Sequence, residues 1–153
     1  MVRPLTPETS MIVKMVAPAF QVFGKEILTG AYERMLANPE AVALFGEDAL
    51  RKRLERPEDL AEILYLAAVH IDDLSEVDAL FDQMAKWHVS EGITFVHYPC
   101  LGEALLSAIR DVLGEGASDR ILEGWHDGFW YLTETLMERE AALYGAQGAS
   151  HAA

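Results

Sequence analysis

The chain has 153 residues, of which 51% are hydrophobic and 24% charged, and its formal net charge is −13. This length suits one compact domain, and the hydrophobic content supports a packed core, which excludes an intrinsically disordered chain. The acidic balance argues against nucleic acid or an anionic membrane surface as the main partner.

The sequence carries no signal for export, membrane insertion or disulfide formation. Its first ten residues, "MVRPLTPETS", hold no apolar run of the kind that a signal peptide needs. No stretch approaches the roughly 18 uninterrupted apolar residues of a transmembrane helix. Cys100 is the one cysteine, so an internal disulfide cannot form. We therefore expect a cytoplasmic protein that inserts into no membrane, as a monomer or a homodimer.

Prolines followed by glutamate mark three helix starts in the first half of the chain. Pro7, Pro39 and Pro57 each stand where a first helical turn tolerates the missing N–H, and each glutamate lies near the positive end of its helix. We expect Pro18 to end or kink the first of these helices.

Apolar residues recur at helical spacing through the rest of the chain, while no stretch alternates as a strand would. Further helices are expected over about 24–37, over about 75–89, from Pro99 to Gly114, and after a capping Ser118. The polar segment 47–55, "EDALRKRLE", is ambiguous. The sequence predicts an all-α fold of about seven helices in one domain, 1–153, with a core over about 5–144 and a flexible tail over 145–153.

Three polar side chains interrupt the apolar faces of these helices. Tyr32 lies one turn after Leu28, His88 one turn after Met84, and Glu140 one turn after Leu136. Arg139 is about as close to the last apolar face as Glu140, so periodicity does not choose between them. Each residue taken alone is more often a core or half-exposed side chain than a ligand. Together they need partners, since an unpaired buried polar group costs about 1–3 kcal/mol.

Several segments resemble the haem domain of flavohaemoglobins and their single-domain relatives among the bacterial globins. The resemblance runs from about Leu5 to Tyr144, over more than nine-tenths of the chain. His88 precedes Tyr98 by ten residues, and a Tyr-Pro pair starts the following helix. The segments that carry it are "AYERML", "NPEAVALF", "RPEDLAEIL", "WHVSEGITFVHYP", "LGEALLSAIRDVLGEGASDRILEGW" and "REAALY".

The resemblance implies a haem b cofactor whose iron is bound by His88 through Nε2. Tyr98 and Glu140 are expected behind this histidine, with Glu140 accepting hydrogen bonds from the His88 Nδ1–H and from Tyr98. The resemblance thereby selects Glu140 over Arg139 for this role. Such an acceptor adds imidazolate character to the iron ligand, which favours reduction of bound oxygen, as in peroxidases.

On the other face of the haem, the resemblance assigns Tyr32 as the phenol that donates a hydrogen bond to bound O₂. Leu60 is expected to overhang the iron, Phe45 to pack on the porphyrin edge, and Leu101 to contact the haem together with Tyr98. No second haem-binding histidine is expected, so the iron should accept a ligand at its open position.

The sequence departs from the family pattern at several of these positions. Arg56 stands where the family usually has glutamine, and three placements remain open: inward beside Tyr32, outward to a haem propionate, or solvated. Trp87 replaces a lysine that lies near the flavin domain of flavohaemoglobins. Phe129 replaces a tyrosine, and Cys100 replaces an aliphatic residue and is expected to be a small buried hydrophobe.

These implications lead to an expected function with alternatives. No flavin-binding barrel or dinucleotide-binding loop follows the last helix in this sequence, so any electron donor should be a separate reductase. We expect a globin that reversibly binds O₂, NO and CO, and that converts NO and O₂ to nitrate if a reductase supplies electrons. A gas or redox sensor acting through a protein partner is the main alternative, and a haem-free globin module is a weaker one.

Overall fold

Helices make up the computed structural model, which describes residues 2–152 and the side chains of 2–145. Within this range there are eight α-helices, three short 3-10 segments and no strand, which confirms the all-α prediction. The α-helices are α1 (Pro7–Val22), α2 (Gly24–Leu36), α3 (Pro39–Phe45), α4 (Glu47–Glu55), α5 (Pro57–Val69), α6 (Asp78–Glu91), α7 (Tyr98–Leu113) and α8 (Asp119–Ala152). The 3-10 segments are Leu74–Val77, Phe95–His97 and Gly114–Gly116.

The helix starts follow the expected capping chemistry. The side-chain oxygens of Thr6 and Asn38 accept backbone N–H groups of the first turns of α1 and α3, at 3.1 and 3.0 Å. Ser118 does the same for α8 at 3.3 Å. Pro18, in contrast, does not end α1, which continues to Val22. Burial of Ala17 and Phe20 on either side of the proline holds this last turn in place.

The ambiguous segment 47–55 forms α4, which accounts for the additional helix. Leu50 is its one fully buried residue, and α4 packs on α2 and α3. The segment has few apolar residues, so contact with α2 rather than its own periodicity makes it helical.

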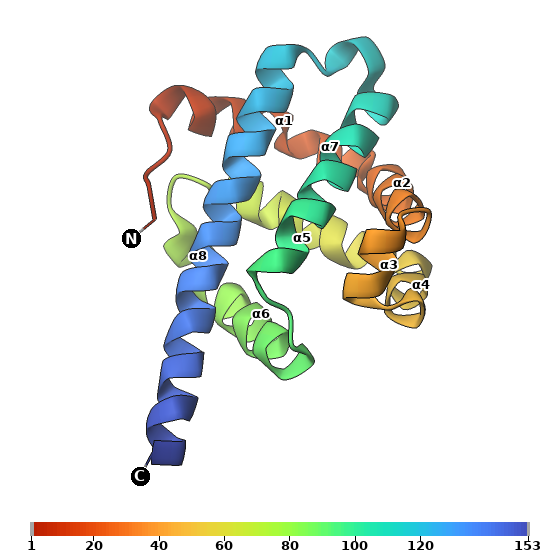
Figure 1. Cartoon of the computed structure of the whole chain (residues 1–153). Helices are drawn as coiled ribbons and strands as arrows, with labels where there is room; N and C mark the ends of the chain where they lie inside the picture. Colours follow the sequence, from red (N-terminus) through yellow and green to blue (C-terminus); the bar gives the residue numbers. More distant parts are fainter. Residues whose placement is uncertain (1, 153) are drawn as a thin grey trace.

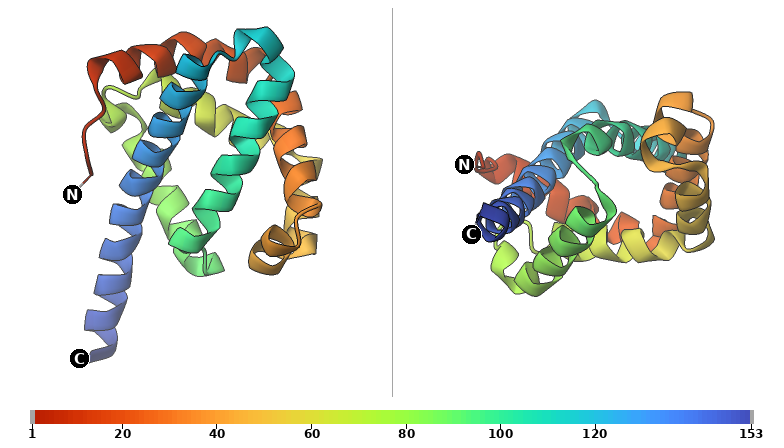
Figure 2. Two further views of the ribbon diagram at one scale, coloured as in Figure 1. Left: turned by 45° about the horizontal axis from the view of Figure 1, so that its top comes forward. Right: turned by 60° about the horizontal axis from the view of Figure 1, so that its bottom comes forward.

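The helices are arranged so that α5 and α6 face each other across an interior cavity. α1 packs on α5 and α8, α2 packs on α7, α5 and α4, and α6 packs mainly on α8. Figure 1 shows α8 running beside α7 along the length of the molecule, with α6 beneath both. Figure 2 shows α6 on one side of the molecule and α3 and α4 on the other.

Close approach of α1 to α8 depends on a glycine. A Cβ built at Gly124 would lie 2.5 Å from Ile12 Cγ2. No side chain fits in that space, so a glycine in α8 lets the buried Ile12 and Val13 of α1 pack directly against its backbone.

α8 is continuous to Ala152, and its last turns project beyond the other helices (Figure 1). The expected flexibility of the tail 145–153 falls mostly on side chains outside the described part, so it stays a prediction. Within residues 2–152, no single helix has the length and hydropathy needed to cross a membrane. The segments Leu74–Glu91 and Phe95–Gly116 reach this length and hydropathy only as a pair, and a 98° bend separates the two segments.

Candidate functional site

A cavity of about 730 Å³ lies between α5 and α6 and is closed by α2, α7 and α8. Its walls are mostly apolar, with Ile63, Ala67 and Met84 among the side chains of the two facing helices. The predicted site residues that line it are Tyr32, Phe45, Arg56, Leu60, His88, Tyr98 and Leu101. Glu140 lies behind His88 rather than on the cavity wall. The structure therefore brings all the predicted residues to one place, while their roles stay predictions.

His88, Tyr98 and Glu140 form a buried hydrogen-bonded cluster that joins α6, α7 and α8. His88 Nδ1 lies 2.8 Å from Glu140 Oε1 and 2.9 Å from the Tyr98 hydroxyl oxygen. The Tyr98 hydroxyl donates to the same Glu140 oxygen at 2.5 Å. His88 is 8% exposed and Glu140 4%, so water does not compete for these bonds. The hydrogen bonds that the sequence predicts from His88 and Tyr98 to Glu140 are present.

This cluster determines which nitrogen of His88 carries the proton. The single Tyr98 proton is donated to Glu140, so the Nδ1 of His88 faces two oxygen acceptors and must be the N–H. In the neutral ring, Nε2 then has a free lone pair. No hydrogen bond among the described residues involves Nε2, and His88 lines the cavity. A basic nitrogen is thus presented to an apolar space.

The phenol of Tyr98 stays protonated over the whole physiological range. Burial, followed by the hydrogen bond to Glu140, raises the pKa of Tyr98 above its ordinary value. The hydroxyl therefore remains a donor, which keeps Glu140 oriented toward His88.

The choice between Glu140 and Arg139, which periodicity left open, is resolved by the packing of α8 on α6. Arg139 lies at the rim, where its two terminal nitrogens bond Asp78 Oδ1 at 2.5 Å and Asp82 Oδ1 at 2.6 Å. Both acids belong to α6, so Arg139 pins α8 to the helix that carries His88. Glu140, the next residue, turns into the buried cluster.

α6 ends one turn after His88, at Glu91, and Gly92 caps it. Gly92 has φ of +73°, a left-handed conformation that side chains rarely adopt, and its neighbour Ile93 donates a backbone hydrogen bond to the His88 carbonyl at 2.9 Å. This cap anchors the helical turn on which His88 sits.

Tyr32 on α2 also lines the cavity. It is 2% exposed, and burial raises the pKa of its phenol, while the Arg53 guanidinium opposes this by charge and hydrogen bonding. Leu60 and Leu64 of α5 line the same part of the cavity. The phenol remains protonated, and no hydrogen bond among the described residues uses its hydrogen, which is therefore available to a guest in the cavity.

Arg56 lies at the edge of the cavity and points outward. Its side chain is 72% exposed and pairs with Asp59 at 3.2 Å within the first turn of α5. Of the three placements that the sequence left open, this geometry argues against the inward one beside Tyr32 and agrees with both outward ones, a solvated arginine or a partner of a haem propionate.

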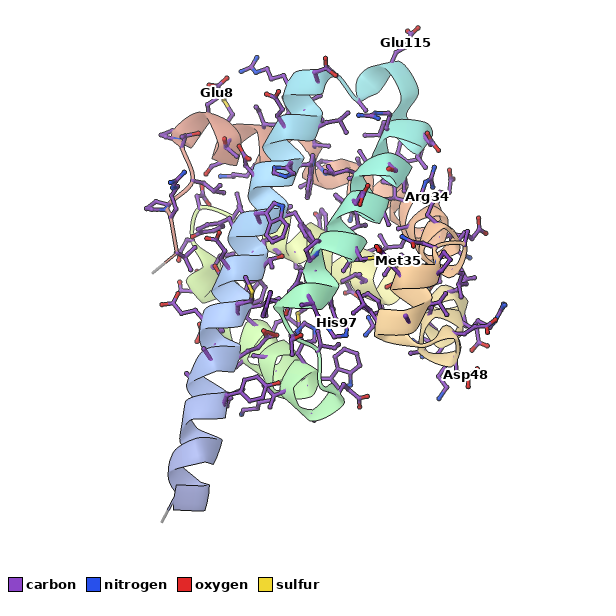
Figure 3. The ribbon with its side chains drawn as sticks, viewed as in Figure 1. Glu8, Arg34, Met35, Asp48, His97 and Glu115 are labelled. Carbon is purple, nitrogen blue, oxygen red and sulfur yellow. The ribbon has the colours of Figure 1, made fainter. Side chains whose placement is uncertain are left out.

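Arg53 and His97 are among the cavity-wall residues that sequence reasoning missed. Arg53 is half-buried on α4, and no apolar periodicity indicated which face of that helix is covered. His97 is half-buried beside α3, at the start of α7 in Figure 3. Its Nε2–H donates to the Leu44 carbonyl at 3.1 Å, and its ring meets Phe45 edge-on with centroids 5.0 Å apart. The sequence signal that could have indicated His97 is its position directly before the Tyr98-Pro99 pair.

The structure also shows where two other departures from the family pattern, Cys100 and Phe129, lie. Cys100 is half-buried rather than fully buried, and burial raises the pKa of its thiol. Phe129 lines the cavity and packs over Gly102, where an added Cβ would lie 2.6 Å from the Phe129 ring.

Curated relatives of this chain are flavohemoproteins. The one from Bordetella pertussis is 36% identical over 143 residues, which cover 93% of this chain and 35% of that protein. Flavohemoprotein A of Dictyostelium discoideum is 34% identical over 141 residues, with the same 35% of its length covered. The chain thus spans about a third of the length of these relatives.

Solved structures with similar folds include whole single-domain proteins. A bacterial globin from Campylobacter jejuni has a TM-score of 0.79 and 26% identity, covering 92% of this chain and 99% of its own. An engineered carbene transferase, built on a protein of Rhodothermus marinus assigned as a nitric oxide dioxygenase, has a TM-score of 0.79 and 27% identity, covering 94% and 99%.

The family model "Globin" matches residues 29–136, a span that begins just before Tyr32 and contains His88 and Tyr98. This match covers more than half of the chain, and the helix arrangement and the relatives agree with it. The chain belongs to the globin family.

Proposed function

We propose that this globin binds haem through His88 and uses it to bind O₂ reversibly, together with NO and CO. The observation that carries the proposal is the orientation of His88, whose Nδ1–H is held by Glu140 and whose Nε2 is free in the cavity. A metal-bound histidine commonly donates its second N–H to a carboxylate in this way.

The donor set fits haem better than a bare metal ion. No group of three or more His, Cys, Asp or Glu side chains among the described residues is arranged to hold a metal. A single imidazole nitrogen suits a metal whose other ligands come from a macrocycle. The volume of about 730 Å³ and the apolar walls also suit a large flat cofactor.

Haem bound here would supply an iron able to bind diatomic ligands. The protein would contribute three effects around it. Glu140 accepts the His88 Nδ1–H and so strengthens the imidazole as a donor. Tyr32 offers a phenol hydrogen to a ligand that gains negative charge. The apolar lining excludes water.

We further propose that the protein removes NO by converting NO and O₂ to nitrate, with electrons from a separate reductase. Support comes from the flavohemoprotein relatives and from the similar structure assigned as a nitric oxide dioxygenase. The strengthened imidazole at His88 is consistent with oxygen chemistry rather than storage alone.

The absorption spectrum of the purified protein tests haem binding. We expect the haemin-loaded protein, once reduced and exposed to CO, to show the sharp band of a histidine-ligated carbonyl complex. His88→Ala should lose stable haem or regain this spectrum only with added imidazole, while His126→Ala, an exposed site on α8, should behave as wild type. A wild-type protein that stays colourless with haemin would contradict the proposal.

Nitrate formation tests the second part. The reduced, oxygenated protein should convert one equivalent of NO to nitrate in a single turnover, and repeated turnover should need an added reductase. Ligand-dependent binding to another protein, without nitrate formation, would favour a sensor instead.

A further inference from the structure

The Arg53 side chain reaches the cavity from α4, and an aromatic ring of α6 sets its position. The Arg53 guanidinium carbon lies 4.9 Å from the centroid of the Trp87 ring. Both residues line the cavity, and Trp87 directly precedes His88. The contact therefore spans the cavity edge from α4 to α6, the helix that carries the candidate iron ligand His88.

Stacking on Trp87 limits where the guanidinium can go. A cation over an indole face gains about 0.5–2 kcal/mol, depending on how far water is excluded. Arg53 is half-buried, and no carboxylate forms an ion pair with it among the described residues. Its charge is thus held in place without being neutralised by contact.

The neighbouring cation Arg56 provides a direct contrast. It also borders the cavity, but its side chain is 72% exposed and its charge is paired with Asp59. A solvated, paired charge acts weakly on its surroundings, whereas a positive charge at an apolar, partly desolvated site acts strongly.

Arg53 also acts on Tyr32, the phenol expected to meet the ligand. Its charge and hydrogen-bonding capacity lower the pKa of Tyr32 against the larger effect of burial. Two donors of different character, a neutral phenol and a permanent cation, therefore serve the same part of the cavity.

We propose that Arg53, held on Trp87, is a second ligand-binding residue beside Tyr32 and makes the site selective for small anionic ligands over neutral ones. The inference rests on the proposed haem binding, because the ligands in question bind at the haem iron. Its chemical class is the small linear anion, such as azide or cyanide, and the same charge stabilises a neutral ligand that becomes partly negative on binding.

The test compares Arg53→Gln with the control Arg51→Gln in the haem-loaded protein, because Arg51 lies on the same helix, outside the cavity lining, and is paired with Glu47. Arg53→Gln should weaken azide binding to the ferric form about tenfold or more, equivalent to about 1.4 kcal/mol. Affinity of the ferrous form for CO, a neutral ligand, should change less than about threefold. Arg51→Gln should leave both constants within about twofold of wild type.

The C–O stretching frequency of the carbonyl complex gives a readout independent of affinity. A positive charge near the ligand draws electron density onto it and lowers this frequency, so Arg53→Gln should raise it and Arg51→Gln should not. Trp87→Leu should produce part of the same rise by freeing the arginine, while Trp87→Phe, which keeps an aromatic face, should produce less. The two Trp87 variants test the same inference if Arg53→Gln folds poorly.

Two results would overturn the inference. One is an Arg53→Gln protein with the azide affinity and C–O frequency of Arg51→Gln. The other is faster haem loss in Arg53→Gln with both properties unchanged, which would make Arg53 an anchor for a haem propionate only. Failure of the wild-type protein to bind haem would instead contradict the proposed function, so the two failures are distinguishable.

Discussion

The Glu140 carboxylate of α8 accepts the His88 Nδ1–H of α6 at 2.8 Å, and both side chains are buried. A carboxylate in this position lends the imidazole negative character and fixes its orientation. The strength of this one contact can be measured in the haem-loaded protein.

Glu140→Gln should weaken the bond between iron and His88, because an amide accepts the Nδ1–H less strongly than a carboxylate does. We expect the iron–histidine stretching band of the ferrous protein to move to lower frequency in a resonance Raman spectrum. Glu138→Gln, the same change at an exposed position two residues earlier, should leave the band in place. An unaltered band in Glu140→Gln would mean that the carboxylate does not tune the imidazole.

Tyr32→Phe should raise the O₂ dissociation rate tenfold or more, if the phenol hydrogen bond contributes about 1.5 kcal/mol. The side chain is buried and lines the cavity, so the loss of one hydroxyl changes little else. Stopped-flow ligand replacement measures the rate, and Tyr65→Phe, outside the cavity lining, is the control. An unchanged rate would reduce Tyr32 to a packing role.

Alkaline pH should destabilise the protein through Tyr98. Because its pKa is raised in the folded state by burial and by Glu140, folded Tyr98 keeps its proton where an unfolded tyrosine loses it. The stabilisation is complete below about pH 10 and is lost as pH rises above that value. Urea unfolding between about pH 9 and 11 should show a shallower decline in Tyr98→Phe than in wild type. Tyr131→Phe should decline as wild type does; equal slopes in all three proteins would contradict the assignment.

Gly124→Ala should lower the free energy of unfolding by about 1–3 kcal/mol, since its Cβ would overlap Ile12 and force α1 from α8. Gly145→Ala is the matched control on the same helix, because a Cβ there meets nothing within 4 Å. It should be neutral or stabilising by up to about 1 kcal/mol, as expected for alanine in an open helical position. Equal stability of the two variants in urea would show that α1 shifts freely.

Much of the fold could be predicted because local signals and packing agree. Proline, capping residues and apolar periodicity marked the starts of α1, α3, α5 and α8. The helix α4 could not be assigned, since its sequence is polar and its single buried Leu50 gives no periodicity. Pro18 was misread in part, because tertiary burial around it outweighs the missing backbone hydrogen bond.

The candidate site could be predicted only as far as the resemblance and helix faces reach. The cluster of His88, Tyr98 and Glu140 depends on how α8 packs on α6, which decides that Glu140 is buried and Arg139 is not. Arg53 was missed for a related reason. Its place in the cavity follows from the orientation of α4, and that orientation is a property of the assembled helices rather than of any local pattern.

The cluster of His88, Tyr98 and Glu140 also sets an order of events during synthesis. His88 leaves the ribosome 52 residues before the carboxylate that bonds it, because Glu140 lies far along α8. If His88 binds haem iron as proposed, a nascent chain that captured haem before this helix emerged would hold the iron with an imidazole that lacks its carboxylate acceptor. On this proposal, the full donor strength of His88 arrives late, with the last long helix, and premature termination would change the chemistry of the bound iron as well as the length of the product.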